Sequence, residues 1–249
     1  MTTKLDLTAL NDAVQKFDLA NQQHHLVKLF EHYDLLSYLI GFDEVQPDED
    51  GPIYHGIMHA YMTALNCLEG AIHTGLGNSE KRAMLVAGLY HDVLHSRGQY
   101  SDNINISVAV KQLEAIHARV PQHLCLKDEE LKIAITAIRQ SKYMGGRYVS
   151  ARPSVYGGIL QDADRMGAYC SNDQELVAMW TGLYQEIDQG RKFNFEAPLT
   201  TEQFMEMQSN FHSGVKWNTK WATVKAMKLN WPNKWKNGLT LLWAQPQFK

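Results

Sequence analysis

An apolar run that ends in a histidine and an aspartate constrains this chain more than any other feature. Residues 86–90 read Val-Ala-Gly-Leu-Tyr, and His91 and Asp92 follow them directly. An imidazole and a carboxylate at the end of a hydrophobic segment are costly to desolvate unless something compensates them. A divalent cation compensates both groups at once, because both are metal ligands. The sequence therefore directs the search toward further ligands for this pair.

Two other segments carry side chains of the same kind. Upstream, His55 and His59 are four residues apart, so they lie on one face of a helix. Downstream, the apolar residues 158–160 lead into Asp162 and Asp164. Histidine, then histidine and aspartate, then aspartate thus follow one another along the chain. This order predicts a metal centre built where three separate helices converge.

Apolar residues at spacings of three and four predict helices along most of the chain. Helices are expected at 8–20, 24–40, 54–74, from the capping residue Ser79 to the His-Asp pair, from Ser101 to about Val120, at 128–140, 155–169 and 173–189, and from Thr201 onward with a break at Pro232. The stretches 141–153 and 190–198 are expected loops. No repeat and no alternation of strands with helices is present, so the expected fold class is all-α.

The length of 249 residues fits one large domain more easily than two. We expect a single domain over 1–249, with a metal-binding core at 50–170, N-terminal helices in 1–45 and C-terminal helices in 171–249 packed on the core. No run approaches the roughly 20 apolar residues of a membrane span. The first residues also lack the apolar core of a signal peptide, which predicts a cytoplasmic protein.

Cysteine spacing and net charge exclude several other classes. Cys67, Cys125 and Cys170 are widely spaced and form no CxxC pair, so they are expected to be small core residues, neither disulfides nor thiolate ligands of zinc. A net charge of −3 is too mild to predict a nucleic-acid or membrane partner for the whole chain. The expected partner is a small molecule, with a homodimer as a candidate assembly.

The ordered quartet resembles the HD-domain superfamily of metal-dependent phosphohydrolases over about residues 50–170. That resemblance implies a helical bundle of the HD/phosphodiesterase type in which the metal ligands are His59, His91, Asp92 and Asp164. The superfamily pattern Ala-Asp-Arg matches residues 163–165 and favours Asp164 over Asp162 as the ligand. Two imidazoles and two carboxylates suit Mn²⁺, Fe²⁺, Ni²⁺, Co²⁺ or Zn²⁺, with Mg²⁺ a candidate at a second position.

Residues 54–60 resemble the Tyr-His-x-x-x-His-Ala segment of cyclic-nucleotide phosphodiesterases within that superfamily. The resemblance implies that His55 donates a proton to the leaving group, and that His95 contacts phosphate or water on the ion. The alternative from the residues alone is that His55 is a capped or stacked residue at a helix start. One departure is Ile104, which stands where nucleotide-acting relatives often carry a glutamate after Asp-Asn. Asp102 is then expected to cap a helix.

The expected activity is hydrolysis of a small phosphoester, with a nucleotide as the substrate class that the resemblance implies. An ion with open coordination positions would activate water, and His55 would act as the acid, beside Asp92 and His95. Positive side chains are needed for the phosphate oxygens. The candidates are Lys142, Arg147 and Arg165; residues 139–161 are expected to form either a phosphate-binding lid or a solvated basic loop.

Two other functions remain open at this level. Some HD-type proteins hold two irons and activate dioxygen through additional histidines, for which His117 and His123 are the candidates. After Glu206, the chain carries lysines interleaved with tryptophans, a pattern found in surfaces that bind nucleic acid or membranes. The competing interpretation of that segment is one buried stripe at helical spacing, formed by Trp217, Trp221, Val224 and Trp231.

Overall fold

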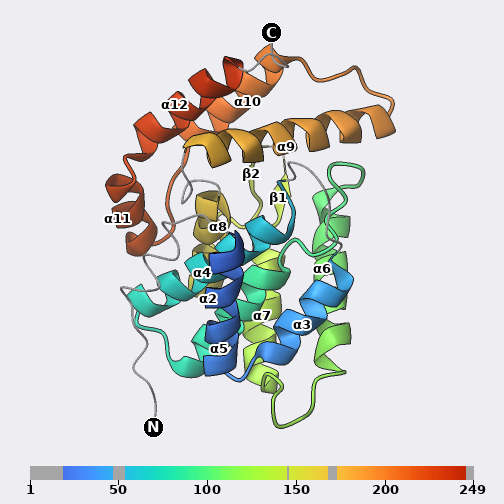
Figure 1. Ribbon diagram of the computed structural model, residues 1–249, viewed down its shortest axis with the longest axis vertical. Coiled ribbons are helices and arrows are strands. Elements are labelled where there is room, and N and C mark those ends of the chain that lie inside the picture. Colours follow the sequence, from blue (N-terminus) through green and yellow to red (C-terminus); the bar gives the residue numbers. More distant parts are fainter. Residues whose placement is uncertain (1–18, 47–53, 145, 168–172, 245–249) are drawn as a thin grey trace.

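The computed structural model describes residues 19–46, 54–144, 146–167 and 173–244, which form a single all-α domain as predicted (Figure 1). The helices are α2 (Leu19–His32), α3 (Leu36–Val45), α4 (Ile57–His73), α5 (Asn78–Tyr90), α6 (Asp102–His117), α7 (Asp128–Gln140), α8 (Val155–Gly167), α9 (Asp173–Phe193), α10 (Thr201–Ser213), α11 (Lys220–Lys228) and α12 (Trp231–Trp243). A short antiparallel hairpin joins α7 to α8 and consists of β1 (Tyr143–Met144) and β2 (Arg147–Tyr148).

The helices form a bundle with a second layer across one end (Figure 1). In the bundle α4 packs on α5 and α8, and α7 packs on the same two helices. In the second layer α9 packs on α12, and α12 packs on α10. Helix α11 contacts α4, α8 and α12, so it ties the layer to the bundle. The hairpin lies between the two parts, beneath α9 (Figure 1).

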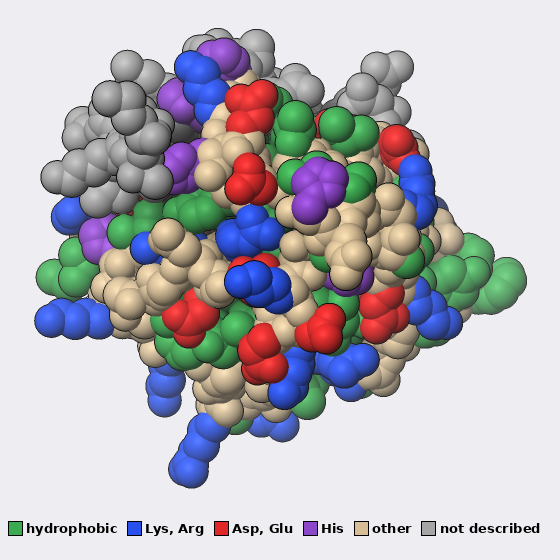
Figure 2. Space-filling view, turned by 90° about the horizontal axis from the view of Figure 1, so that it is seen from below, with side chains coloured by type: hydrophobic (Ala, Val, Ile, Leu, Met, Phe, Trp, Pro, Cys, Tyr) green, Lys and Arg blue, Asp and Glu red, His purple; other side chains and the backbone are tan. Residues whose placement is uncertain are grey.

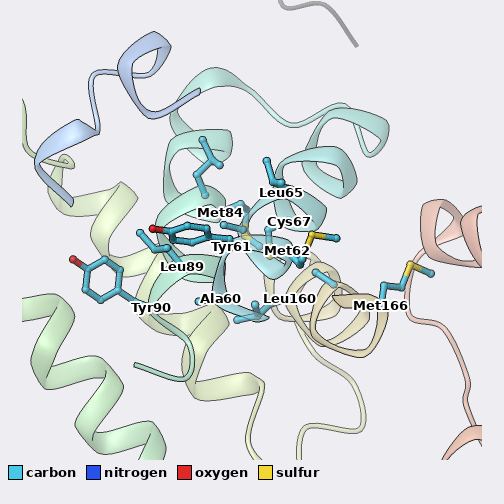
Figure 3. Close-up of a cluster of buried hydrophobic side chains, with 14 of the residues drawn as sticks. Ala60, Tyr61, Met62, Leu65, Cys67, Met84, Leu89, Tyr90, Leu160 and Met166 are labelled. Carbon is cyan, nitrogen blue, oxygen red and sulfur yellow. The ribbon is translucent and has the colours of Figure 1, made fainter. Parts of the chain in front are cut away.

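Helix α4 runs through the centre of the bundle and is buried on all sides from His59 to Ala71. Its apolar side chains meet those of α5 and α8 in one cluster (Figure 3). The backbones of α4 and α5 approach closely at Gly88 of α5, where an added Cβ would lie 2.7 Å from the Cα of Ala64. Because no side chain separates the two backbones here, the end of α5, and with it His91, is brought against α4.

Several predicted boundaries were wrong. The expected helix 24–40 is interrupted, since Asp34 has a φ of 56° and the amide of Leu35 donates to the carbonyl of Phe30. Asp tolerates this left-handed conformation, and the apolar spacing continues across the break, so the pattern did not reveal it. Helix α9 runs on to Phe193, into the expected loop 190–198. Most of the expected helix 8–20 lies outside the described residues.

Two further elements differ from expectation. Pro232 lies in the first turn of α12, where a missing N–H removes no helical hydrogen bond, so it begins a helix after the short gap that follows α11. Part of the expected loop 141–153 is the β1–β2 hairpin, in which Tyr143 pairs with Tyr148 and Gly146 has a φ of +79°. That positive φ is readily adopted by glycine and allows the tight reversal of the chain.

Gly88→Ala is expected to lower the free energy of unfolding by about 1–3 kcal/mol, because the new methyl group meets the α4 backbone and forces the helices apart. Urea unfolding measures the change. Gly77→Ala is the control, since a Cβ there meets nothing closer than 3.4 Å. Equal stability of the two variants would show that α4 and α5 can separate here without cost.

Candidate metal centre

Four ligand-type side chains from three segments converge at the end of α5. His59 lies in the first turn of α4, His91 and Asp92 directly follow α5, and Asp164 lies on α8. One ligand atom from each lies within 4.8 Å of all the others. The Nε2 atom of His59 is 3.1 Å from Asp164 Oδ1, and the Nε2 atom of His91 is 3.0 Å from Asp92 Oδ2. Metal–ligand bonds of about 2.0–2.2 Å require ligand atoms spaced in this way.

The hydrogen bonds around the quartet orient two of its members. The Nδ1 atom of His91 lies 2.8 Å from the carbonyl oxygen of Gly88, so Nδ1 carries the proton that it donates. When this ring is neutral, the lone pair of Nε2 therefore points toward the other ligands. On the opposite side, the hydroxyl of Tyr148 donates to Oδ2 of Asp164 at 2.6 Å, and Oδ1 faces the histidines.

The charges of the quartet favour a cation at its centre. Burial alone lowers the pKa of His91, but Asp92 and Asp164 outweigh it and raise that pKa well above its usual value. Burial alone raises the pKa of Asp164, yet the hydrogen bonds and charges of His59 and His91 bring it below its usual range. The carboxylates thus stabilise positive charge at this point, whether carried by protons or by an ion.

The donor chemistry of these residues fits a divalent ion. His59 and His91 are each only 1% exposed, and their Nε2 atoms lie 3.2 Å apart. Two imidazole nitrogens directed at each other, with two carboxylates beside them, form a ready set of nitrogen and oxygen donors. The quartet named from the sequence is thus brought together. Asp162 is not part of it: its carboxylate accepts hydrogen bonds from the backbone amides of Asn218 and Thr219, where α11 begins.

A second group lies beside the quartet and contains a residue that sequence reasoning missed. Glu186 of α9 is 4% exposed; its Oε1 accepts from the amides of Tyr54 and His55, and its Oε2 accepts from Nδ1 of His55 at 2.6 Å. The other ring nitrogen of His55 lies 3.9 Å from Asp92 Oδ2. No local pattern around Glu186 indicated this role, because its partners are distant in sequence.

His55 and His95 are stacked with their ring centres 3.8 Å apart, yet they titrate in opposite directions. Burial alone lowers the pKa of His55, but the charge of Glu186, with those of Asp92 and Asp164, raises it to about 9. Burial, and then the charge of His55, lowers the pKa of His95 to about 3. At neutral pH, His55 is therefore protonated and His95 is neutral.

His55, His95 and Glu186 are also close enough together to hold an ion. Two features favour a proton instead. Both oxygens of Glu186 already accept hydrogen bonds from N–H groups, and Nδ1 of His95 lies 3.1 Å from the amide of Arg97, which donates to it. Neutral His95 then carries its proton on Nε2, as a hydrogen-bond donor.

Both groups open into one cavity of about 600 Å³ between the bundle and the second layer. Its walls come from the loop after α5, the start of α6, the hairpin, α8, α9 and α10. The lining includes the following residues: His55, Asp92, His95, Asp102, Asn105, Tyr143, Tyr148, Asp164, Arg165, Trp180, Gln208, Phe211 and His212. The quartet thus has room for a small molecule beside it.

Arg165 is the one phosphate candidate of the three that lines this cavity; Lys142 and Arg147, though described, are not part of its lining. Its guanidinium stacks on the ring of Tyr148 at 4.4 Å, and its Nη1 donates to the carbonyl of Lys216 at 3.0 Å. Its Nε is buried without a hydrogen-bond partner within the described residues. Asp102 does not cap α6 with its side chain; its Oδ2 accepts from the amide of Tyr143.

The residues of the two alternative functions lie elsewhere. Nδ1 of His117 is 2.5 Å from the hydroxyl of Tyr38, and His123 is exposed, so neither joins the quartet. In the C-terminal segment Trp221 and Trp231 are buried, as the packing interpretation expects, and Trp217 is partly buried against the core. Val224 was wrongly placed in that buried stripe, because it is 42% exposed.

On the face shown in Figure 2, acidic and basic side chains are interspersed, so this face carries no extended patch of one charge. Among the described residues, no helix combines the length and the apolar character needed to cross a lipid bilayer.

No protein-family model matches the chain, and no curated protein matches it in sequence. The helical fold and the His/Asp quartet are compatible with the HD-type arrangement.

Glu186→Gln is expected to lower the pKa of His55, since the neutral amide no longer stabilises the imidazolium. The protonated fraction of His55 would then fall as pH rises through a lower range than the value of about 9 in the parent protein. NMR titration of the His55 ring measures the shift. Glu196→Gln is the control, because Glu196 is 58% exposed and pairs with Arg191. An unchanged titration of His55 would contradict the pairing.

Proposed function

We propose that this protein is a metal-dependent phosphohydrolase that cleaves a small phosphoester, with a nucleotide as its substrate. The observation that carries the proposal is the convergence of three features on one cavity. These are the quartet of metal-ligand type, the protonated His55 and the guanidinium of Arg165. They match the three requirements of phosphoester hydrolysis, which are an activated nucleophile, an acid for the leaving group and positive charge near the phosphoryl oxygens.

His59, His91, Asp92 and Asp164 would hold the ion. A bound divalent ion supplies a water of lowered pKa and polarises a phosphoryl oxygen, so that hydroxide can attack phosphorus near neutral pH. The chain contributes orientation: Gly88 fixes the ring of His91, and Tyr148 fixes the carboxylate of Asp164. No covalent nucleophile is required from the protein.

His55 would donate the proton to the departing oxygen. Glu186 holds the ring through Nδ1, which leaves Nε2 as the donating atom on the side of Asp92. A phosphoester seated at the quartet would bring its leaving oxygen within reach of that nitrogen. Glu186 also keeps the ring charged at neutral pH, so the proton is in place before the bond breaks.

Arg165 and His95 would bind the phosphoryl oxygens. The stacking of Arg165 on Tyr148 and its bond to Lys216 hold the guanidinium beside Asp164. A fixed guanidinium stabilises charge that grows in the transition state without having to reorganise. His95 would add a neutral N–H donor from the other side of His55.

The wall formed by α9 and α10 supports a nucleotide as substrate. Its cavity-lining rings include Trp180, Phe211 and His212, which offer flat, uncharged surfaces. Gln208 is 7% exposed, and it also lines the cavity. Its side-chain amide offers both a hydrogen-bond donor and an acceptor, so a ligand with complementary groups would bind here. A nucleobase has such an edge and a planar ring.

Asp92→Ala is expected to lower metal-dependent phosphate release by more than about 100-fold, since loss of a ligand exceeds the 10–100-fold effect of losing a ligand's partner. A screen of nucleotides with Mn²⁺, Ni²⁺, Co²⁺, Zn²⁺ or Mg²⁺, read by phosphate release and product chromatography, measures it. His123→Ala is the control and should retain full activity, because that side chain is exposed and outside the quartet. Unchanged hydrolysis by the Asp92 variant would reject the proposal, and oxygen uptake that requires His123 would favour the oxygenase.

Gln208→Ala is expected to raise the KM for the best nucleotide by about 10-fold, because the base loses a partner inside a buried wall. Hydrolysis of p-nitrophenyl phosphate, whose ring carries no such edge, should change little in the same variant. Steady-state kinetics with both substrates give the comparison. Equal effects on the two substrates would show that Gln208 does not contact a base.

A further inference from the structure

The two oxygens of Asp164 have different surroundings. Oδ1 lies 3.1 Å from Nε2 of His59 and 3.7 Å from Nε2 of His91. Oδ2 accepts the hydroxyl proton of Tyr148 at 2.6 Å, the length of a hydrogen bond to a charged acceptor. A phenol is protonated at neutral pH, so this hydroxyl is the donor and the carboxylate oxygen is the acceptor. One oxygen is therefore held by the protein, and the other faces the position of the ion.

Tyr148 belongs to the hairpin and is fixed from several sides. Its ring stands edge-on to the ring of Tyr143, its partner across the strands, at 5.3 Å. The guanidinium of Arg165 covers its face. Strand β1 is in turn anchored to α6, because the amide of Tyr143 donates to Asp102 at 2.6 Å. The position of Asp164 thus depends on a segment that also forms part of the cavity wall.

We propose that Tyr148 is a positioning residue that holds Asp164 as a one-oxygen ligand and thereby couples metal binding to the stability of the β1–β2 hairpin, which lines the cavity. An unrestrained carboxylate rotates and can present either or both oxygens. With Oδ2 held, Asp164 is oriented before the ion arrives, and less ordering is needed on binding. The inference rests on the proposed metal site, but not on the reaction carried out there.

The coupling must act in both directions. If the bond from Tyr148 raises the affinity of the site for a metal, metal binding must stabilise that bond by the same factor. The hairpin would then be held more firmly in the loaded protein.

The first test compares Tyr148→Phe with Tyr143→Phe. Phenylalanine keeps the ring under Arg165 and removes only the hydroxyl that binds Asp164. The affinity for Mn²⁺ or Zn²⁺, measured by competition with a chelator, should fall about 10- to 100-fold in the Tyr148 variant. The Tyr143 variant loses a hydroxyl from the paired residue, and its affinity should match that of the parent protein. Unchanged affinity in the Tyr148 variant would overturn the proposal.

The decisive part of the second test uses the parent protein, so it remains valid if the variant fails to fold. Amide hydrogen exchange over residues 142–149 should slow when Mn²⁺ or Zn²⁺ is added to the parent protein. In Tyr148→Phe, metal should change that exchange little. If the amide exchange rate of the parent protein does not change when metal is added, the coupling is overturned. A protein that binds metal and protects the hairpin, yet cleaves no nucleotide, would reject only the proposed function; a protein that binds no metal would reject both.

Discussion

The structure depends on the compensation of buried charge at the end of α5. His59 and His91 are almost fully buried, and two carboxylates lie against them. Such groups cannot be left in the interior without partners of opposite charge. The three elements that carry these side chains, α4, the end of α5 and α8, must therefore meet at one point. The same requirement that makes the site suitable for a cation also determines how α4, α5 and α8 are packed.

Close backbone contact makes that convergence geometrically possible. Gly88 lets α5 touch α4, and its carbonyl also orients the ring of His91. A second contact of this kind joins Gly98, in the loop after Asp92, to Gly190 of α9, where an added Cβ would lie 2.7 Å from the Gly98 backbone. One turn earlier on α9, Glu186 reaches His55. The layer above the cavity and the bundle beneath it are therefore aligned by contacts that only glycine permits.

The site separates two kinds of histidine by their surroundings. The two buried imidazoles of the quartet face carboxylates, whereas His55 and His95 are stacked side by side. Glu186 makes one of that pair a cation, and burial together with that cation keeps the other neutral. A proton donor and a neutral hydrogen-bond donor are thus obtained from adjacent rings. Proximity to one carboxylate decides between the two roles, since an imidazole has no strong preference near neutral pH.

The sequence by itself determined the all-α class and the three segments that supply the quartet, and the family resemblance selected His59 and Asp164 within those segments. Helical spacing is a local property, and ligand-type residues at the ends of apolar runs stand out along the chain. It did not reveal Glu186, the bond from Tyr148 to Asp164 or the hairpin, and it could not separate Arg165 from Lys142 and Arg147 as a cavity residue. Tertiary structure decided these points, because each depends on side chains from distant segments meeting, and such meetings leave no periodic pattern near either partner.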